Sequence, residues 1–304
     1  MRAIIWISIV LLIWLLVPDL YSETVRYIRI HTIVPNEIPL AHYLEKPRIP
    51  LSQRTVVALG PDPSRIDELY YTLYSVVDQS HRVDEIEINL PVSCLLPDWL
   101  EKITRLGSVV QIKRYSDVFR NVSSTIERYK NQDMNIIVVH DQILYRYRTI
   151  FKLCNTLRMY PHHAVTGTGY RLERIDGTPR SFPYVGKGVR TVDSLMSTSG
   201  YIFNAKLFDG DTYETIRSAY PEFKGAEDAF TSIQLSTSAP IISLEWMNGL
   251  SLPRIPLLKK MVSELMNKHS RVSSDHRTYQ TDESRTWATN GYKTDPWYIR
   301  SVVR

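Results

Sequence analysis

Short apolar runs alternate with segments of helical periodicity in the first half of this chain. Four segments have the length of strands: the apolar runs at residues 55–59 and 135–139, the alternating segment at residues 85–90, and residues 109–115. Helix signals follow each of them. Strands and helices that alternate at such intervals form a mostly parallel sheet covered on both faces. The sequence therefore predicts an α/β fold, in which ligands bind beyond the carboxyl ends of the strands.

The predicted helices are bounded by ordinary cap signals. Residues 64–67 (SRID) have capping-box-like spacing, and apolar residues follow at helical intervals as far as Val77. A short helix is predicted to begin at Pro97, and a longer one covers residues 145–159. Residues 171–192 are rich in Gly, Pro and Arg, and this composition predicts a long surface loop.

Composition and charge argue against a nucleic-acid partner. The net charge of +5 arises from Lys and Arg residues that are spread along the chain, and such a mild cationic bias suits an anionic small molecule. Cys94 and Cys154 lack CxxC spacing, which excludes a paired-cysteine metal site and leaves one disulfide or none. His162 and His163 follow a proline and indicate a surface turn rather than a metal site.

The N-terminus carries a targeting signal. Arg2 precedes an unbroken apolar run over residues 3–17, which as a helix reaches about 22 Å, short of the roughly 30 Å hydrocarbon core. This length suits a signal-peptide core or a short signal anchor, and the preceding charge favours a cytoplasmic N-terminus. We expect a type II membrane anchor in the secretory pathway, Golgi or an equivalent compartment, or a secreted protein if the segment is cleaved. A buried N-terminal helix is the third alternative.

Four segments follow from these patterns. Residues 1–22 are the predicted anchor or signal, and residues 23–53, with several prolines and no clear periodicity, are a predicted stem or linker. Residues 54–255 form the predicted α/β domain. Residues 256–304 form a predicted C-terminal helix followed by a polar tail.

The fourth predicted strand ends on His140, Asp141 and Gln142. A buried strand that surfaces on an acidic residue often holds a metal or a phosphate in α/β enzymes. A divalent cation favours several oxygen ligands, but this triplet has one carboxylate. Two interpretations stay open: Asp141 and His140 contact a metal or diphosphate, or Asp141 caps the next turn while His140 covers the sheet edge.

A set of motifs follows in order along the first part of the predicted domain: Pro63-Ser64-Arg65-Ile66, then Ser75 and Gln79 on one predicted helix, then the string from Asp84 to Pro91. This ordered set resembles the family-2-like nucleotide-sugar glycosyltransferases. The resemblance covers roughly residues 54 to 245. It implies a GT-A fold, which is a Rossmann-like, mostly parallel sheet flanked by helices, with a donor half and an acceptor half.

The resemblance implies a donor site at the ends of the first and fourth strands. His140-Asp141-Gln142 falls where relatives carry an Asp-rich triplet, so Asp141 and His140 would hold Mn²⁺ or Mg²⁺, which neutralises the leaving diphosphate. Ser64 and Arg65 fall at the donor nucleotide loop. Asp117 aligns loosely with a donor-site Asp, although the motif that follows it in relatives is absent here.

The resemblance also implies an acceptor side and a general base. Gly200 and Tyr201 fall on a segment that lines the acceptor site, and Glu227-Asp228 falls on an acidic pair that opens a helix. Asp228 would take the acceptor proton, and Glu227 would orient or bind the acceptor. Taken by itself, an acidic pair at this position is ordinary helix capping.

Two functional hypotheses follow. The first is a transferase that moves a sugar from a nucleotide-sugar donor to a hydroxyl of a glycan, protein or lipid, with the inverting mechanism that the resemblance implies. The second is a catalytically inactive GT-A-fold protein that binds a glycan or serves as a scaffold, as the incomplete triplet at His140–Gln142 suggests.

Overall fold

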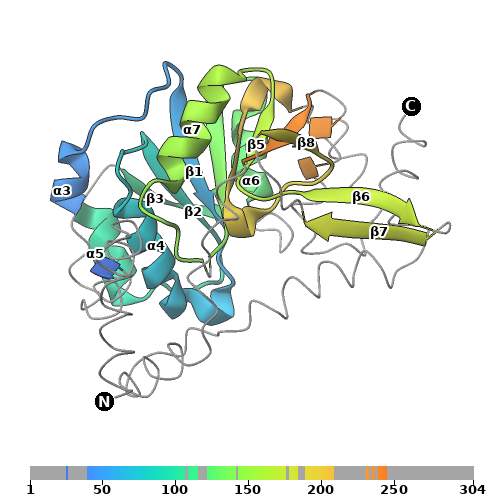
Figure 1. Ribbon diagram of the computed structural model, residues 1–304. Helices are drawn as coiled ribbons and strands as arrows, with labels where there is room; N and C mark the ends of the chain where they lie inside the picture. Colours follow the sequence, from blue (N-terminus) through green and yellow to red (C-terminus); the bar gives the residue numbers. More distant parts are fainter. Residues whose placement is uncertain are drawn as a thin grey trace, which may run out of the picture.

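A mixed β-sheet forms the centre of the molecule (Figure 1). The computed structural model describes residues 25–26, 40–106, 109–115, 122–141, 143–175, 178–183, 189–208, 231–232, 235–236 and 239–244. Within these residues, eight strands form one sheet in the order β3-β2-β1-β4-β9-β5-β10-β8. They are β1 (Arg54–Leu59), β2 (Glu85–Pro91), β3 (Val110–Tyr115), β4 (Met134–Val139), β5 (Ala164–Thr166), β8 (Arg190–Val192), β9 (Tyr201–Asn204) and β10 (Ile241–Ser243).

Parallel pairing connects the first four strands. β2 pairs with β3 and β1, and β1 pairs with β4, in each case in parallel. β9 lies antiparallel between β4 and β5, β10 runs parallel to β5, and β8 forms an antiparallel edge. The predicted α/β fold with a mostly parallel sheet is therefore confirmed. The register pairs Leu59 with Val139, so the loops after β1 and β4 begin side by side.

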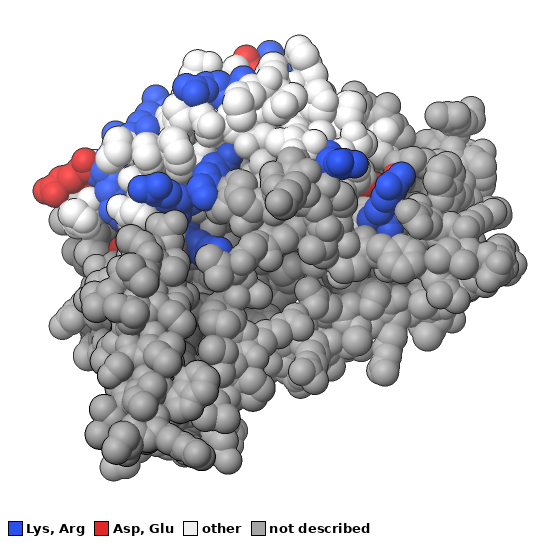
Figure 2. All heavy atoms as spheres, in the orientation of Figure 1, with Lys and Arg blue, Asp and Glu red and all other residues white. Residues whose placement is uncertain are grey.

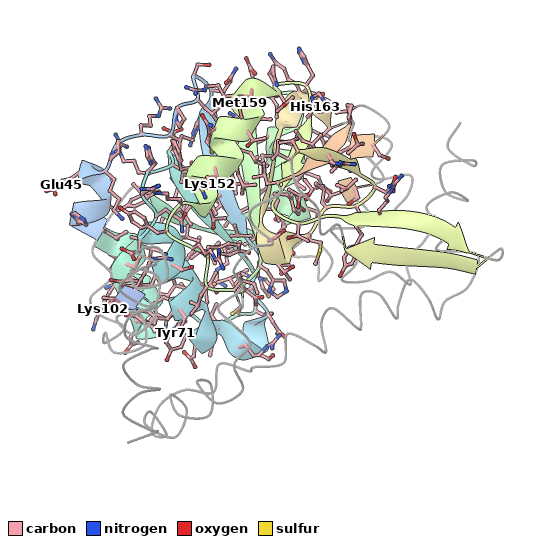
Figure 3. All side chains as sticks on the ribbon, in the orientation of Figure 1. Glu45, Tyr71, Lys102, Lys152, Met159 and His163 are labelled. Carbon is pink, nitrogen blue, oxygen red and sulfur yellow. The ribbon has the colours of Figure 1, made fainter. Side chains whose placement is uncertain are left out.

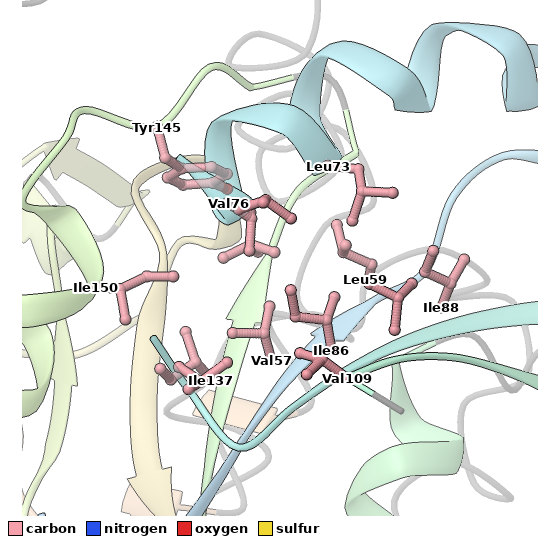
Figure 4. Packing of buried hydrophobic residues seen from close by; sticks show 14 of the residues in the cluster. Val57, Leu59, Leu73, Val76, Ile86, Ile88, Val109, Ile137, Tyr145 and Ile150 are labelled. Carbon is pink, nitrogen blue, oxygen red and sulfur yellow. The ribbon is translucent and has the colours of Figure 1, made fainter. Parts of the chain in front are cut away.

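Helices cover both faces of the sheet, as the alternation of the sequence predicts. One face is covered by α4 (Leu69–Val77), α5 (Asp98–Leu106) and α7 (Thr149–Met159), and the other by α6 (Ser123–Tyr129). Val57 and Ile137 pack with Ile150 in the first core cluster (Figure 4), whereas Val56 packs with Ile126 in the second. Because the central strands are buried on both faces, they appear in the sequence as nearly continuous apolar runs.

Part of the predicted stem packs against the α/β unit. The helix α3 (Leu40–Glu45) places the ring of Tyr43 in the first core cluster, together with Ile49. The Tyr43 hydroxyl accepts a hydrogen bond of 2.8 Å from the backbone N–H of Val83, just before β2. Residues 40–51 therefore belong structurally to the domain that follows them.

The segment predicted as a long surface loop contains regular structure. The strands β6 (Tyr170–Ile175) and β7 (Thr178–Pro183) form an antiparallel hairpin that projects from the sheet (Figure 1), and β8 follows. Ile175 pairs with Thr178, so two residues connect the strands. The sequence carries the signal for this turn, Asp176-Gly177, which is a common two-residue hairpin connection. The high Gly, Pro and Arg content of residues 171–192 favoured a loop over this hairpin in the prediction.

Three further predictions concern the two ends of the chain, the two cysteines and the distribution of charge. Residues 3–17 and residues 256–304 lie outside the described residues, and the described helices include none that is both long and apolar enough to cross a membrane. Cys94 and Cys154 are buried free thiols, which decides against a disulfide between them. Lys and Arg side chains are scattered among neutral residues on the face drawn in Figure 2.

The two adjacent histidines lie in a turn, as predicted. His162 is exposed, and the ring of His163 packs edge-on against Tyr160 with 5.5 Å between the ring centroids. His163 precedes β5, and it lies at one end of the sheet whereas Tyr71 of α4 lies at the other (Figure 3). These histidines are therefore remote from the carboxyl ends of the parallel strands.

Candidate functional site

Asp141 connects the end of β4 to the loop after β1. Its Oδ2 atom accepts a hydrogen bond of 2.9 Å from the backbone N–H of Asp62. The side chain of Asp141 is only 9% exposed. Because β1 and β4 are parallel neighbours, the two loops leave the sheet at the same edge, where α/β proteins bind ligands.

Asp62 organises the turn that contains the predicted donor residues. Its Oδ1 atom accepts hydrogen bonds from the backbone N–H of Ser64 at 2.9 Å and from the Ser64 hydroxyl at 2.8 Å. The Arg65 Nε atom lies 3.7 Å from Asp62 Oδ2. Ser64, Arg65 and Asp141, which the sequence assigns to the donor side, therefore all surround Asp62.

The N-cap of the helix that follows β1 differs from the prediction. Asp62, rather than Ser64, is the N-cap, and it starts the 3-10 helix η2 (Pro63–Glu68), after which α4 begins at Leu69. The backbone of Arg65 departs from helical geometry, with φ of −126° and ψ of 24°, so the predicted single helix is divided into two. The sequence signal was present, because Asp followed by Pro and Ser is typical of a helix start.

The carboxylate of Asp141, a predicted metal ligand, has partners within the protein. Asp141 Oδ2 is bonded to the Asp62 amide, and Asp141 Oδ1 lies 3.1 Å from Nδ1 of His140. In the part of the chain that the structure describes, no three His, Cys, Asp or Glu side chains are grouped for a metal. Mg²⁺ is usually held by one or two carboxylates together with substrate phosphates and waters, so the metal role of Asp141 and His140 stays a prediction.

Three buried polar side chains, two on α4 and one just after its end, hold the loop that follows Asp141. The Thr72 hydroxyl donates to the carbonyl of Asp141 at 2.6 Å, and the Ser75 hydroxyl accepts from the backbone N–H of Tyr145 at 3.1 Å. Gln79, two residues after the end of α4, donates to the carbonyl of Arg146 at 2.7 Å. Ser75 and Gln79, which carried part of the family resemblance, therefore fix the loop that bears Asp141.

Tyr145 links this loop to the turn before β9. Its hydroxyl accepts a hydrogen bond of 2.6 Å from the backbone N–H of His140 and donates one of 2.6 Å to the carbonyl of Ser197. Ser197 begins the 3-10 turn η3 (Ser197–Ser199), which leads into Gly200. The loops after β4 and before β9 are thus joined by a single buried side chain.

Gly200 occupies a position that other residues rarely adopt. Its φ is +76° and its ψ is 145°, a region that is nearly restricted to glycine. A Cβ atom at this position would lie 3.3 Å from Leu153 Cδ1 and 3.6 Å from Tyr145 Cε1. The predicted acceptor-side glycine therefore lies beside the candidate site, and backbone geometry accounts for its identity.

Tyr201 is placed in the core. It is fully buried, and its ring stacks on Phe203 with 6.3 Å between centroids, in the cluster on the α6 face. The backbone of Tyr201 pairs with Val138 at the end of β4, which puts it close to the candidate site in the sheet. The described position offers no exposed ring surface, and the acceptor-binding role of Tyr201 stays a prediction.

Several predicted site residues lie outside the described residues. These are Asp117, Gln142, Glu227 and Asp228, so the structure does not test the general base or the second donor-side carboxylate. Within the described part, sequence reasoning assigned no role to Asp62, Thr72 or Tyr145. Asp62 carried an N-cap signal, whereas Thr72 and Tyr145 become recognisable only when the loop lies against α4.

The chain was compared with known proteins to test the family resemblance. No protein-family model matches it, and no curated protein is significantly similar. The resemblance to glycosyltransferases therefore rests on the sequence motifs alone.

Proposed function

We propose that this chain is a glycosyltransferase with a GT-A-like fold that moves a sugar from a nucleotide-sugar donor to a hydroxyl acceptor. The supporting observation is the convergence of residues from three distant stretches of the chain. Ser64 and Arg65 surround Asp62, whose amide binds Asp141, and Gly200 packs near Tyr145 in the loop that follows Asp141. The parallel half and the mixed half of the sheet accord with a donor half and an acceptor half.

The proposed reaction assigns a role to each of these groups. The acceptor oxygen attacks the anomeric carbon, the bond between that carbon and the diphosphate oxygen breaks, and the acceptor proton passes to a base. By resemblance, Asp228 is that base and Glu227 orients the acceptor. Arg65, whose side chain is 25% exposed, is suited to bind the diphosphate, since guanidinium groups form strong charge-assisted hydrogen bonds with phosphate.

The donor side is proposed to include Ser64, Asp117 and Asp141, with Gly200 and Tyr201 on the acceptor side. Asp141 would hold the turn at the donor through hydrogen bonding. Its negative charge, with His140, would also hold Mn²⁺ or Mg²⁺ together with the donor diphosphate, whose charge such an ion neutralises when bound.

The function is tested by incubating the full chain with a panel of nucleotide sugars, with and without Mn²⁺, and measuring release of the nucleotide diphosphate. We expect turnover with at least one donor and its loss in Asp228→Asn. Asp133→Asn is the matched control, because Asp133 lies just before the amino end of β4 and its side chain is 52% exposed. Donor binding without turnover, unchanged by Asp228→Asn, would contradict catalysis.

A second candidate function is that of a catalytically inactive glycan-binding or scaffold protein. It is favoured by the engagement of both Asp141 carboxylate oxygens with groups of the protein itself, which gives this carboxylate a structural role. Glycan binding that is retained in Asp228→Asn, together with no turnover of any donor, would support this alternative.

Membrane attachment through residues 1–22 is part of the proposal. Its support is the apolar run at residues 3–17 with Arg2 ahead of it. The measurement is alkaline extraction of membranes from cells that express the full chain. An anchored protein stays in the membrane pellet at its full mass, whereas a cleaved signal yields a shorter protein in the soluble fraction.

A further inference from the structure

Arg26 reaches from the N-terminal segment into the interior of the α/β unit. Its side chain is only 8% exposed. Arg26 Nε donates to Asp78 Oδ2 at 2.8 Å, Nη2 donates to the carbonyl of Ser75 at 2.8 Å, and Nη1 donates to the carbonyl of Tyr145. One guanidinium group thus bridges the end of α4 and the loop that follows Asp141.

A second cation from the same part of the chain supports this arrangement. Lys46 Nζ donates to the carbonyl of Val77 at 3.0 Å and to that of Gln79 at 2.8 Å. The last carbonyls of a helix lack partners within the helix and carry partial negative charge. Arg26 and Lys46, both from the predicted stem, therefore stabilise the carboxyl end of α4.

The contacts of Tyr145 relate Arg26 to the candidate site. Arg26 binds the Tyr145 carbonyl, Ser75 binds the Tyr145 amide, and the Tyr145 hydroxyl accepts from the backbone N–H of His140. These contacts fix Tyr145 at its backbone and at the end of its ring. The position of the His140–Asp141 turn therefore depends on Tyr145, which Arg26 holds in part.

We propose that Arg26 is a positioning residue, which uses the N-terminal segment to hold the His140–Asp141 turn in its functional geometry. Arg26 would hold this turn whether or not the protein is an enzyme, whereas an effect of Arg26 on catalysis rests on the proposed function. A guanidinium group suits this task because its planar donors can bind a carboxylate and two carbonyls at once, whereas a lysine ammonium is a compact point charge.

The position of Arg26 also limits the reach of the proposed anchor. Only residues 18–25 separate the apolar run from Arg26. Eight residues at roughly 3.5 Å each span at most about 28 Å. With the anchor in a membrane, the α/β unit is held near the membrane surface, in reach of acceptors that are themselves attached to the membrane.

The first test measures hydrogen exchange of the full chain. We compare wild type with Arg26→Ala and Arg26→Lys, following peptides that cover residues 140–148 and, as an internal reference, β2. We expect exchange over residues 140–148 to rise roughly tenfold or more in Arg26→Ala and less in Arg26→Lys, because the Tyr145 carbonyl and Asp78 lose a charged partner. Equal exchange in all three proteins would overturn the proposal.

A matched control separates positioning from general destabilisation. Arg128→Ala removes another arginine that is paired with a buried carboxylate, Glu87, on the other face of the sheet. We expect it to leave exchange over residues 140–148 at the wild-type rate, because Glu87 lies on β2 and not on that loop. If both variants raised exchange uniformly along the chain, Arg26 would be a general stability residue, and the proposal would be wrong. If Arg26→Ala does not fold, Arg26→Lys against the same control decides the question.

A second readout uses the proposed activity. We expect Arg26→Ala to lower kcat for donor turnover by about tenfold or more with a smaller change in KM, and millimolar methylguanidinium to restore part of the loss by filling the vacated site. Unchanged kcat in a folded Arg26→Ala protein with raised exchange would overturn the catalytic role. If wild type turns over no donor, the proposed function fails, whereas the exchange result still decides the structural role of Arg26.

Discussion

The carboxylate of Asp141 and the backbone N–H of Asp62 form a hydrogen bond of 2.9 Å between residues that are 79 positions apart. This bond joins the loops that leave two neighbouring parallel strands. It gives Asp141 a structural role at the position where the proposed function needs a donor-side carboxylate. Substitutions at Asp141 are therefore expected to separate a structural effect from a chemical one.

Asp141→Ala should lower the free energy of unfolding by about 1–3 kcal/mol, because the Asp62 amide loses its acceptor. Asp141→Asn should cost less, since an amide oxygen can still accept from that N–H, yet it should lose most donor turnover because the negative charge is gone. Urea denaturation and diphosphate release measure the two effects. Equal stability of Asp141→Ala and wild type would contradict the structural role.

Gln79→Leu should destabilise the protein by about 2–4 kcal/mol. The buried amide of Gln79 donates to the carbonyls of Ser75 and Arg146 and accepts from the backbone N–H of Ile150, and leucine leaves all three groups without this partner. Gln132→Leu is the control, because the hydrogen bond of Gln132 is exposed. We expect it to lie within about 0.5 kcal/mol of wild type in urea denaturation. Similar losses in both variants would refute the role of Gln79 in holding the loop.

Gly200→Ala should cost about 1–3 kcal/mol, since its backbone conformation is nearly restricted to glycine and the added Cβ would press on Leu153. Thermal unfolding measures the change. Gly60→Ala serves as the control, because Gly200 is the described glycine with positive φ and Gly60 is not. A Gly200→Ala protein as stable as wild type would indicate a different backbone conformation before β9.

The stability of the protein should fall at mildly acidic pH partly through His81. Burial, with a smaller contribution from the Arg148 cation, lowers the pKa of His81 from its usual 6.5, and its ring stacks on Phe151 at 4.4 Å. Folding therefore favours the neutral ring. The contribution is present above pH 6.5 and is lost as the pH falls toward the lower folded-state pKa.

The loss of unfolding free energy between pH 7.5 and pH 5.5 should accordingly be smaller in His81→Gln than in wild type. Arg148→Gln should reduce it as well, but by less, because burial is the larger cause. Urea denaturation at each pH checks this. Parallel pH profiles for wild type and His81→Gln would show that His81 does not contribute.

The strongly periodic elements could be predicted from the sequence. The predicted strands β1 to β4 are confirmed. β1 and β4 are buried on both faces, which makes their apolar runs nearly continuous, whereas β2 alternates apolar and polar residues. The β6–β7 hairpin was missed because its short strands are rich in Arg and Pro, although its Asp-Gly connection was visible. The predicted helix start at Ser64 is two residues too late, because Asp62 is the N-cap, and the non-helical backbone of Arg65 had no signal in the local spacing.

The candidate site could be predicted only in part. The positions of Ser64, Arg65 and Asp141 at strand ends follow from the strand pattern, because the carboxyl ends of neighbouring parallel strands meet at one edge. The hydrogen bonds that hold these residues in place cannot be predicted from the strand pattern. Thr72 on α4 resembles any helix residue until the loop after β4 lies against it.

By itself, the sequence determined the α/β class, the four parallel strands and the residues at their ends, since these depend on the period of neighbouring side chains. Tertiary structure alone decided that Asp141 binds the Asp62 amide and that Arg26 binds the carbonyl of Tyr145, 119 residues away. Such contacts form only when packing of the sheet and α4 has brought distant segments together. Their energy depends on burial and geometry, which no local pattern records.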